Sequence, residues 1–257
     1  MSTIPFTVVI PARYGASRLP GKPLIEIAGR PLIEHVHRRA LGMGATRVVV
    51  ATDDERIEVA CRRFGAEVVL TRIDHPTGTD RISEVVEYLG LDDEAVVVNV
   101  QGDEPLMPTG LPSRIVAALA SDPESAIATA AVPIEEGDEI FDPAAVKVVR
   151  DAAGRALYFS RAPIPWQRDR FPQPPAAERS GQSGWLRHLG LYAYRAAFLR
   201  RFPRLSVAPP EEVEQLEQLR ALWHGYRIQV AVVDDRPGPG VDTEEDVRRV
   251  EEVLQNV

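Results

Sequence analysis

Short apolar runs alternate with amphipathic stretches over the first 130 residues, and this alternation constrains the fold more than any other feature. Continuous apolar runs rich in Val and Ile are typical of strands that are buried on both faces. When such strands alternate with helices, they form a mostly parallel sheet covered by helices. We therefore predict a three-layer α/β/α fold with strands at residues 6–10, 47–51, 67–70, 95–100 and 126–132.

The stretches between these runs carry the usual signals for the start and end of a helix. The first opens with Pro31 and ends near Gly44, and the second opens with Asp53 and ends at Gly65. Proline is favoured in the first turn of a helix, Asp caps it, and glycine is favoured just after its end. We expect helices at residues 31–43, 53–64, 79–89 and 109–119.

After Pro133 the pattern changes to strands with few helices between them. A segment from Pro163 to Gly184 has five prolines between residues 163 and 175. It predicts a long loop, and long loops often carry function. Because the sequence shows no repeat and no clear linker, we predict one domain over residues 1–257 with a β-rich excursion over roughly 134–200. The strands expected in this excursion lie at 146–150, 157–160 and 186–195.

The C-terminal part returns to the α/β pattern. Residues 211–223 predict one helix, residues 227–233 predict a strand, and a last helix begins at Thr243. In the first of these helices, four apolar side chains recur at helical spacing, which is typical of a face packed on the core. The four are Val213, Leu216, Leu219 and Trp223.

The charge balance excludes one class of function. The 257 residues include 30 basic and 38 acidic side chains, a net charge of −8, whereas a general nucleic-acid binder needs a basic face. The charge is uneven, because residues 150–204 contain 11 arginines and only 3 acids while both flanking parts are acidic. The fold must therefore place one positive segment within an acidic body.

Other features of the sequence bear on location. No apolar run approaches the ~20 residues of a membrane-spanning helix, so no membrane insertion is expected. The N-terminus has no basic residue before Arg13, unlike a signal peptide. Cys61 is the single cysteine, which excludes an intrachain disulfide and suits a reducing, cytoplasmic location.

The loop after the first predicted strand has the composition of a phosphate-binding loop. In open α/β sheets, ligands bind at the carboxyl ends of strands, where this loop lies. Arg13, Arg18 and Lys22 are cations with no acid among them, and Gly15 and Gly21 let backbone N–H groups approach a ligand. Five residues separate these glycines and a proline follows Lys22, so the loop is neither a P-loop nor GxGxxG. A solvated basic loop is the alternative.

Two aspartates follow predicted turns near the same edge of the sheet. Asp103 comes just after the fourth strand, and Asp242 follows a glycine-rich turn before the last helix. Carboxylate oxygens there suit Mg²⁺ held between protein and phosphates. Each aspartate also has a plainer explanation. Asp103 lies between Gly102 and Pro105 as a turn residue, and Asp242 belongs to a sequence that resembles a helix capping box.

A third candidate is the segment ThrGlyThrAspArg, residues 77–81, which precedes a predicted helix. Small hydroxyls and an exposed helix N-terminus can hold an anion or the edge of a base. An ordinary helix N-cap explains the same pattern. The sequence shows no Ser-His-Asp or Cys-His pattern that would indicate nucleophilic catalysis.

Taken together, these segments resemble those of the 3-deoxy-D-manno-octulosonate (Kdo) cytidylyltransferases, also called CMP-Kdo synthetases. Two of the segments, IPARYGASRLPGKPL and VNVQGDEP, are shared in looser form by many sugar nucleotidyltransferases. Their combination with RHLGLYAYR and EQLEQLR points to the Kdo branch. Thr77 stands where the family usually has Ser, which keeps the hydroxyl. The matching segments are IPARYGASRLPGKPL, TDDERI, HPTGTDRISEV, VNVQGDEP, YFSRAPIPW, RHLGLYAYR, EQLEQLR and GVDTEEDV.

The resemblance implies a nucleotide-diphospho-sugar transferase-like fold and an activity. CMP would pass from CTP to the anomeric 2-hydroxyl of Kdo, with release of pyrophosphate, to give CMP-Kdo for lipopolysaccharide biosynthesis. The implied catalytic residues are Arg13 and Lys22 at the triphosphate, and Asp103 and Asp242 as Mg²⁺ ligands. Contacts to CTP are implied for Arg13, Ser17, Lys22, Thr79, Arg81, Gln101 and Asp103, and contacts to Kdo for Gln101, Arg161, His188, Tyr192, Glu217 and Gln218.

The resemblance also implies a homodimer formed through the β-rich excursion, whose arginines would meet acidic surface of their own chain or of a second copy. Three alternatives stay open. One is a cytidylyltransferase for a related 2-keto sugar acid such as sialic acid. The second is a catalytically silent nucleotide-sugar sensor, which the presence of Arg13, Lys22, Asp103 and Asp242 disfavours. The third is a Rossmann oxidoreductase, which the missing GxGxxG disfavours.

Overall fold

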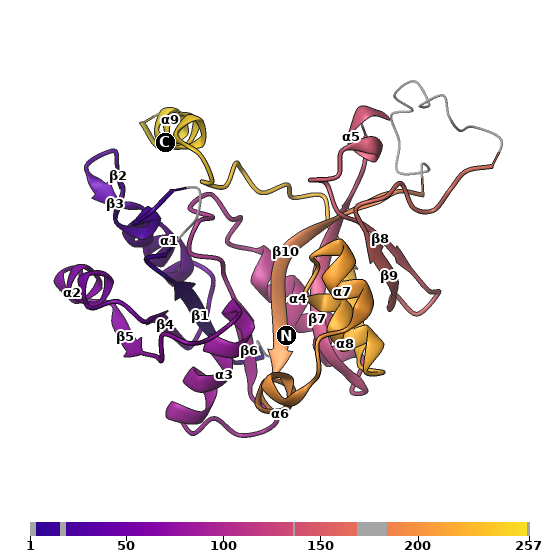
Figure 1. The fold of residues 1–257 in the computed structure, drawn as a ribbon, viewed down its shortest axis with the longest axis horizontal. Coiled ribbons are helices and arrows are strands. Elements are labelled where there is room, and N and C mark those ends of the chain that lie inside the picture. Colours follow the sequence, from indigo (N-terminus) through magenta and orange to yellow (C-terminus); the bar gives the residue numbers. More distant parts are fainter. Residues whose placement is uncertain (1–3, 16–18, 136, 169–183, 256–257) are drawn as a thin grey trace.

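One nine-stranded sheet organises the molecule (Figure 1). The computed structural model describes residues 4–15, 19–135, 137–168 and 184–255. Within them the strands run in the order β11-β7-β10-β6-β1-β4-β5, β8 pairs with β10, and β9 pairs with β8. The strands are β1 (Phe6–Ala12), β4 (Arg47–Thr52), β5 (Glu67–Leu70), β6 (Val96–Asn99), β7 (Ser125–Pro133), β8 (Lys147–Arg150), β9 (Ala156–Ser160), β10 (Leu186–Arg195) and β11 (Arg227–Val232), beside a small hairpin of β2 (Glu26–Ile27) and β3 (Arg30–Pro31).

The prediction of a mostly parallel sheet is confirmed. β1 is parallel to β4 and β6, β4 to β5, and β11 to β7, whereas β10 is antiparallel to β6, β7 and β8. The helices are α1 (Leu32–Leu41), α2 (Glu55–Arg63), α3 (Gly78–Tyr88), α4 (Leu111–Ser121), α5 (Gly137–Phe141), α6 (Ala196–Arg201), α7 (Pro209–Glu214), α8 (Gln218–Trp223) and α9 (Glu244–Gln255), with 3₁₀ turns η1 (Lys22–Leu24) and η2 (Phe202–Arg204).

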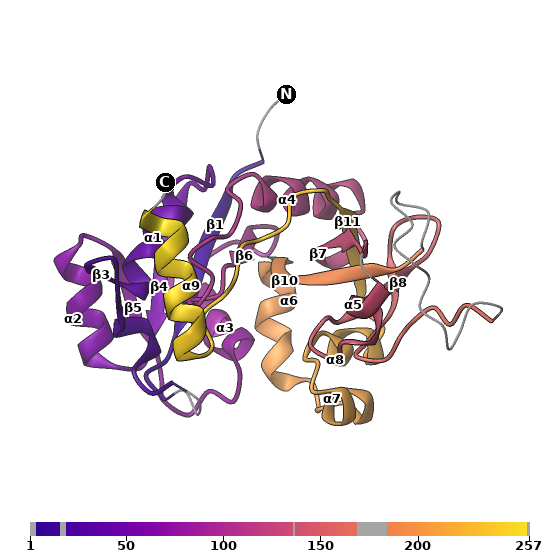
Figure 2. The same ribbon diagram turned by 90° about the horizontal axis from the view of Figure 1, so that it is seen from above.

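Alternate side chains of the central strands build a separate core on each face of the sheet. In β1, Val8 and Ile10 pack in one core with α1 and α4, whereas Val9 packs in the other with α3 and α6. All three side chains are fully buried, and burial of one such side chain is worth about 1.5–3 kcal/mol. Figure 2 shows the sheet between α4 on one side and α6 on the other, which is the predicted three-layer arrangement.

The prediction of a single helix over residues 211–223 is wrong. Gln215 adopts a left-handed conformation with φ of 51°, which separates α7 from α8. The Nε of Arg161 donates to the carbonyl oxygen of Glu214 at 2.8 Å, so a side chain satisfies the end of α7 in place of a further helical turn. Because the break resets the helical face, Val213 and Trp223 are 84% and 60% exposed. Only Leu216 and Leu219 of the predicted stripe are buried.

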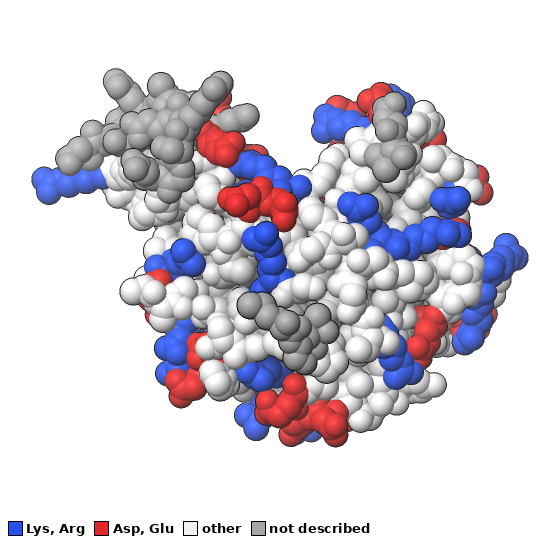
Figure 3. All heavy atoms as spheres, turned by 180° about the vertical axis from the view of Figure 1, so that it is seen from behind, with Lys and Arg blue, Asp and Glu red and all other residues white. Residues whose placement is uncertain are grey.

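The arginine-rich segment meets acidic surface of its own chain where it is described. Four of its arginines form ion pairs with acids from the first 149 residues, and Figure 3 shows both charge signs interspersed over one face of the molecule. The pairs join Arg155 to Asp122 and Glu124, Arg187 to Glu139, Arg195 to Glu94, and Arg200 to Glu87 and Asp93.

The predicted excursion over 134–200 contributes α5, β8, β9, β10 and the start of α6. Because β10 pairs with β6 and β7 in the middle of the sheet, this segment is part of the same sheet and contacts its core. The predicted loop at 163–184 falls for the most part outside the described residues. None of the helices in the described part of the chain combines the length and apolar character that a membrane crossing requires.

Candidate active site

The carboxyl ends of two neighbouring parallel strands form the floor of the candidate site. β1 leads into Arg13, and β6 leads into Gln101 and Asp103. The two loops approach closely at Gly102, where a Cβ atom would lie 2.8 Å from the carbonyl oxygen of Pro11. A side chain at this position would therefore push the loops apart, which explains the glycine between Gln101 and Asp103.

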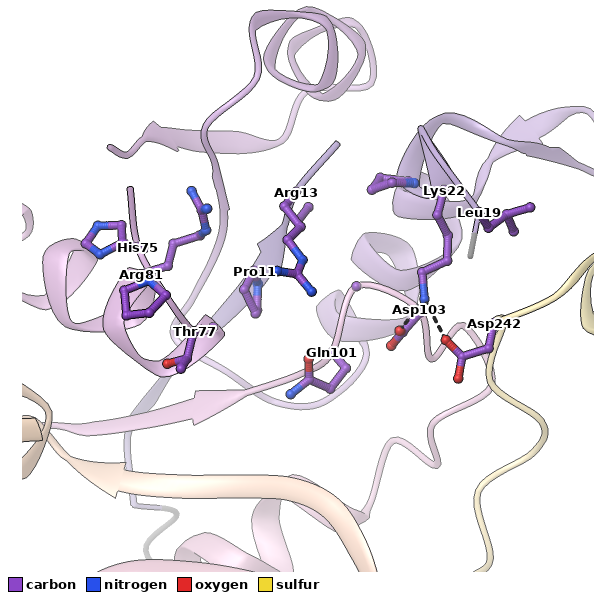
Figure 4. Close-up of a pocket in the computed structure, with 15 residues that line it drawn as sticks. Pro11, Arg13, Leu19, Lys22, His75, Thr77, Arg81, Gln101, Asp103 and Asp242 are labelled. Carbon is purple, nitrogen blue, oxygen red and sulfur yellow. Dashed lines mark hydrogen bonds and ion pairs between the residues drawn. The ribbon is translucent and has the colours of Figure 1, made fainter. Parts of the chain in front are cut away.

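A cavity of about 440 Å³ lies over these strand ends (Figure 4). It brings together residues that are far apart in the sequence, from the loop after β1, the start of α3, the loop after β6 and the segment before α9. The predicted nucleotide and metal residues that line it are Arg13, Lys22, Arg81, Gln101, Asp103 and Asp242.

Lys22 joins the two candidate metal-binding aspartates. Its Nζ donates to Oδ2 of Asp103 at 2.6 Å, to Oδ1 of Asp242 at 3.1 Å and to the carbonyl oxygen of Val241 at 2.9 Å. Burial alone would lower the pKa of this ammonium, but the two carboxylates outweigh burial and raise it. Lys22 is therefore a permanent cation within the carboxylate pair.

The segment after β11 returns across the molecule to α9 and brings Asp242 to the site (Figure 1). The N–H of Val241 donates to the carbonyl oxygen of Asp103 at 2.9 Å, which ties the two loops together. The capping box of α9 is formed by Thr243 and Asp246, whose side chains accept from each other's backbone N–H groups. Asp242 is thus not the cap of this helix, and its Oδ1 faces Lys22 instead.

The donor set at Asp103 and Asp242 fits a small divalent cation. Their carboxylates already hold one positive charge, the Lys22 ammonium. Within the described residues no cluster of three or more His, Cys, Asp or Glu side chains could hold a metal. Mg²⁺ is commonly bound through one or two carboxylates, with the remaining positions filled by substrate phosphates and water. Asp103 and Asp242, which line a cavity of about 440 Å³, meet that requirement.

A second cavity, of about 830 Å³, adjoins the first and shares Gly78 and Gln101 with it. It extends along β10 and over the start of α8. Five of the six residues predicted to contact the sugar line this cavity, namely Gln101, His188, Tyr192, Glu217 and Gln218. The sixth, Arg161, does not line either cavity.

Arg161 instead supports the chain around the break between α7 and α8. Besides the bond to Glu214, its Nη1 donates to the carbonyl oxygen of Pro143 at 2.8 Å and its Nη2 to that of Gln215 at 3.5 Å. The predicted role of Arg161 as a sugar contact therefore stays a prediction without support from its position. Ser17, predicted to contact CTP, lies outside the described residues.

Two further nucleotide candidates lie near the junction of the cavities. Thr79 lines the second cavity rather than the first, and its hydroxyl donates to Oε1 of Glu217. Burial raises the pKa of Glu217, although hydrogen bonds from the hydroxyls of Thr77 and Thr79 oppose the rise. Arg81 lines the first cavity, where Nη2 donates to Asp53 at 2.6 Å and Nη1 to the hydroxyl of Thr71.

His188 is a neutral side chain in the wall of the second cavity. Burial lowers the pKa of its imidazole to about 3. Its Nε2 lies 2.9 Å from the hydroxyl of Thr129, which in turn lies 2.8 Å from the carbonyl oxygen of Leu191. Because that carbonyl takes the hydroxyl hydrogen, Nε2 carries the imidazole proton and Nδ1 is left as an acceptor. The ring of Tyr192 packs 5.4 Å from that of His188.

Sequence reasoning missed two charged residues in the second cavity, Glu104 and Arg187. Burial, and to a lesser extent the neighbouring Asp103, raise the pKa of Glu104 to about 7. Its Oε2 is buried without a hydrogen-bond partner. Both residues belong to segments that resemble the Kdo cytidylyltransferases, Glu104 to VNVQGDEP and Arg187 to RHLGLYAYR. The available signal was an ionisable side chain next to a predicted site residue in each motif.

Comparison with known proteins agrees with this geometry. The family model described as cytidylyltransferase matches residues 7–228. The 3-deoxy-manno-octulosonate cytidylyltransferase of Halorhodospira halophila is 66% identical over 257 residues, which cover all of this chain and 99% of that protein. The chain belongs to the 3-deoxy-manno-octulosonate cytidylyltransferase family. The enzyme of that name from Alkalilimnicola ehrlichii is 59% identical, over 98% of this chain and 97% of that protein.

Solved structures place the fold in the same family. A CMP:2-keto-3-deoxy-manno-octonic acid synthetase complexed with CTP is 40% identical and superposes with a TM-score of 0.87, over 98% of this chain and 99% of that one. A cytidylyltransferase from Leptospira borgpetersenii, at 14% identity and a TM-score of 0.60, shares the fold alone. As a member of the 3-deoxy-manno-octulosonate cytidylyltransferase family, this chain is a nucleotidyltransferase.

Proposed function

We propose that this chain transfers CMP from CTP to the anomeric 2-hydroxyl of Kdo, releasing pyrophosphate and forming CMP-Kdo. The observation that carries the proposal is the meeting of two cavities at Gly78 and Gln101. One cavity has the cations and carboxylates that suit a nucleoside triphosphate, and the other has the polar and aromatic residues that suit a sugar. An acceptor hydroxyl in the second cavity can therefore reach a phosphorus atom in the first.

The reaction asks mainly for positioning and for neutralisation of phosphate charge. A bond forms between the 2-oxygen of the sugar and the α-phosphorus, while the bond from that phosphorus to the oxygen that bridges to the β-phosphate breaks. The hydroxyl proton is released and pyrophosphate leaves. Arg13 and Lys22 line the nucleotide cavity, and their charges would hold the triphosphate in line for attack. Gln101, which lines both cavities, would orient the two substrates relative to each other.

Mg²⁺ is the cofactor that we propose for Asp103 and Asp242. Bound there, the ion would neutralise charge on the phosphates and lower the pKa of the attacking hydroxyl. Lys22 would exchange its bonds to the carboxylates for bonds to the triphosphate. This exchange would replace the single positive charge beside the two aspartates with the double charge of the ion.

Pyrophosphate release tests the proposed function. The protein is incubated with CTP, Mg²⁺ and one of a panel of 2-keto sugar acids, and the same panel is repeated with UTP and ATP. We expect release with CTP and Kdo only. Release with sialic acid but not Kdo would assign the chain to the related acceptor instead, and no release with any acceptor would favour a silent nucleotide-sugar sensor.

We also propose that the chain acts as a cytoplasmic homodimer, where CTP is available and where the activated sugar enters lipopolysaccharide synthesis. Exposed apolar side chains on two contacting elements, β9 and α8, support the dimer. Leu157 and Trp223 are each 60% exposed.

The molar mass measured by light scattering across a salt series should be that of a dimer. A monomer at every salt concentration would exclude it, and Leu157→Asp should weaken the dimer whereas Tyr88→Asp, an exposed change on α3, should not.

A further inference from the structure

The second cavity has an unfavourable charge for a sugar acid. Four carboxyl side chains line it, whereas Kdo itself carries a carboxylate beside its anomeric carbon. An anion that enters a partly desolvated cavity among carboxylates is repelled unless a cation faces it. The four acids are Glu104, Glu139, Asp142 and Glu217.

Among the described residues that line this cavity, Arg187 is the single Lys or Arg. His188 cannot replace it, because burial lowers the pKa of that imidazole to about 3 and keeps it neutral. Lys22 and Arg13 line the other cavity, where the triphosphate needs them. The nearby Arg161 donates to three backbone carbonyl groups and does not line the cavity.

Arg187 is held in a defined position that leaves part of its guanidinium unused. Nη1 donates to Oε1 of Glu139 at 2.7 Å, and the other oxygen of Glu139 lies 3.5 Å from Nη1 of Arg236. Arg236 is in turn anchored by a 2.6 Å bond to the carbonyl oxygen of Pro133. No other hydrogen bond from the Arg187 guanidinium is formed within the described part of the chain. A planar guanidinium fixed on one side can still present a two-pronged donor face to a carboxylate.

We propose that Arg187, positioned by Glu139, binds the carboxylate of the sugar acid and makes this site select an acid over the corresponding neutral sugar. This inference rests on the proposed function and assigns the residue that recognises the acceptor. Glu104 lines the same cavity with a buried oxygen that lacks a hydrogen-bond partner, and this oxygen can accept a hydrogen bond from a hydroxyl of the sugar. Glu104 thus binds a hydroxyl group of the sugar, Glu139 positions Arg187, and Arg187 binds the charge.

Steady-state kinetics with two acceptors test the assignment. The acceptors are Kdo and its C1-reduced analogue, in which a hydroxymethyl group replaces the carboxylate. We expect Arg187→Met to lower kcat/KM for Kdo by about 100-fold, mainly through KM, since loss of one partner of a buried charge pair has effects of this order. The KM for CTP should change less than about twofold, and the preference for Kdo over the analogue should disappear. Arg187→Lys keeps the charge without the fork and should recover part of that preference.

Two further variants separate this proposal from its competitors. Arg204→Met removes an exposed arginine that lines neither cavity and controls for the change in net charge. Arg161→Met should keep the preference for the acid. If Arg161→Met loses that preference, or if Arg187→Met keeps it with CTP binding intact by calorimetry, the assignment to Arg187 is overturned. Failure of the wild type to release pyrophosphate with Kdo would overturn the proposed function as well, and so the two failures are distinguishable.

Discussion

The Nζ of Lys22 lies 2.6 Å from Oδ2 of Asp103, within the carboxylate pair where the metal is proposed. A lysine ammonium and a divalent cation cannot both occupy the space between the two aspartates. Lys22 therefore competes with the ion for the two carboxylates until a nucleotide binds.

Removal of this ammonium should strengthen metal binding in the absence of nucleotide. In Lys22→Met, Asp103 and Asp242 keep their charges but lose the cation that holds them. We expect Mn²⁺, used as a probe, to bind about tenfold more tightly than to the wild type, which is about 1.4 kcal/mol. Free Mn²⁺ can be measured by electron paramagnetic resonance. Equal or weaker binding would show that Lys22 does not compete with the metal.

Each candidate metal ligand should be required for turnover. Asp103→Asn and Asp242→Asn keep the shape of the side chain and remove its charge, so pyrophosphate release should fall by about 10³-fold because several kcal/mol of charge stabilisation are lost. Asp234→Asn is a matched control, since Asp234 is exposed on the same segment between β11 and α9. Normal turnover in either site variant would remove that residue from the metal site.

The close approach of the two strand-end loops should also be required for activity. In Gly102→Ala the new methyl group would lie 2.8 Å from the carbonyl oxygen of Pro11, so the loops that carry Arg13 and Asp103 must separate. Misplacement of catalytic groups by about 1 Å can lower a rate by about 100-fold. We therefore expect kcat/KM to fall by about 10- to 100-fold. Gly110→Ala, where a Cβ meets no atom within 4 Å, should retain the wild-type rate.

The stability of α7 and α8 should depend on one buried ion pair. Arg220 donates to Glu211 through both Nε and Nη2, at 2.8 and 2.6 Å, and both side chains are buried. Glu211→Ala leaves the guanidinium without this partner, and we expect a loss of about 3–5 kcal/mol in the free energy of unfolding. Urea denaturation measures the loss. The neighbouring exposed change Glu212→Ala should cost less than about 0.5 kcal/mol, and similar values for both variants would contradict the importance of the pair.

Acid should destabilise the fold partly through His188. Burial lowers the pKa of its imidazole in the folded protein to about 3, from the ordinary value of about 6.5. The unfolded chain therefore binds more protons between these two values, and stability falls as the pH falls below 6.5. From pH 7 to pH 5 this group alone accounts for about 2 kcal/mol. His188→Gln keeps a partner for Thr129 and should lose that much less stability over the same interval in urea titrations. An unchanged pH dependence would show that His188 is not buried in the neutral form.

The sequence predicted the sheet and the nucleotide end of the site because both depend on short-range patterns. A β-branched run marks each buried strand, and the carboxyl ends of parallel strands meet at one edge. Arg13 and Asp103 lie just after such strands and Lys22 lies in the same loop as Arg13, so their meeting could be inferred. Asp242 was harder, because its place depends on a long return from β11 across the sheet.

The residues that line the second cavity could be predicted only in part. Their positions depend on which side chains donate hydrogen bonds to backbone carbonyl groups, and these contacts are distant in the sequence. The break at Gln215 has no local signal strong enough to interrupt a helical stripe, and it is satisfied by Arg161 from a distant strand end. Because its guanidinium donates to backbone carbonyl groups there, Arg161 does not line the second cavity. The same cavity instead contains Arg187, which the antiparallel pairing of β10 with β7 brings there.

Along the path of described strands from β11 to β5, β10 is the one strand antiparallel to its neighbours, and it lines the second cavity but not the first, so the two cavities draw on different parts of the sequence. Loops at the ends of β1 and β6 line the first cavity, whereas β10 and the segments around it line the second together with Glu104, and Gly78 and Gln101 line both cavities. Substitutions in β10 can therefore change which sugar acid the site accepts and leave the residues that line the first cavity unchanged. Evolution can therefore alter the specificity for the acceptor without altering the specificity for the nucleotide.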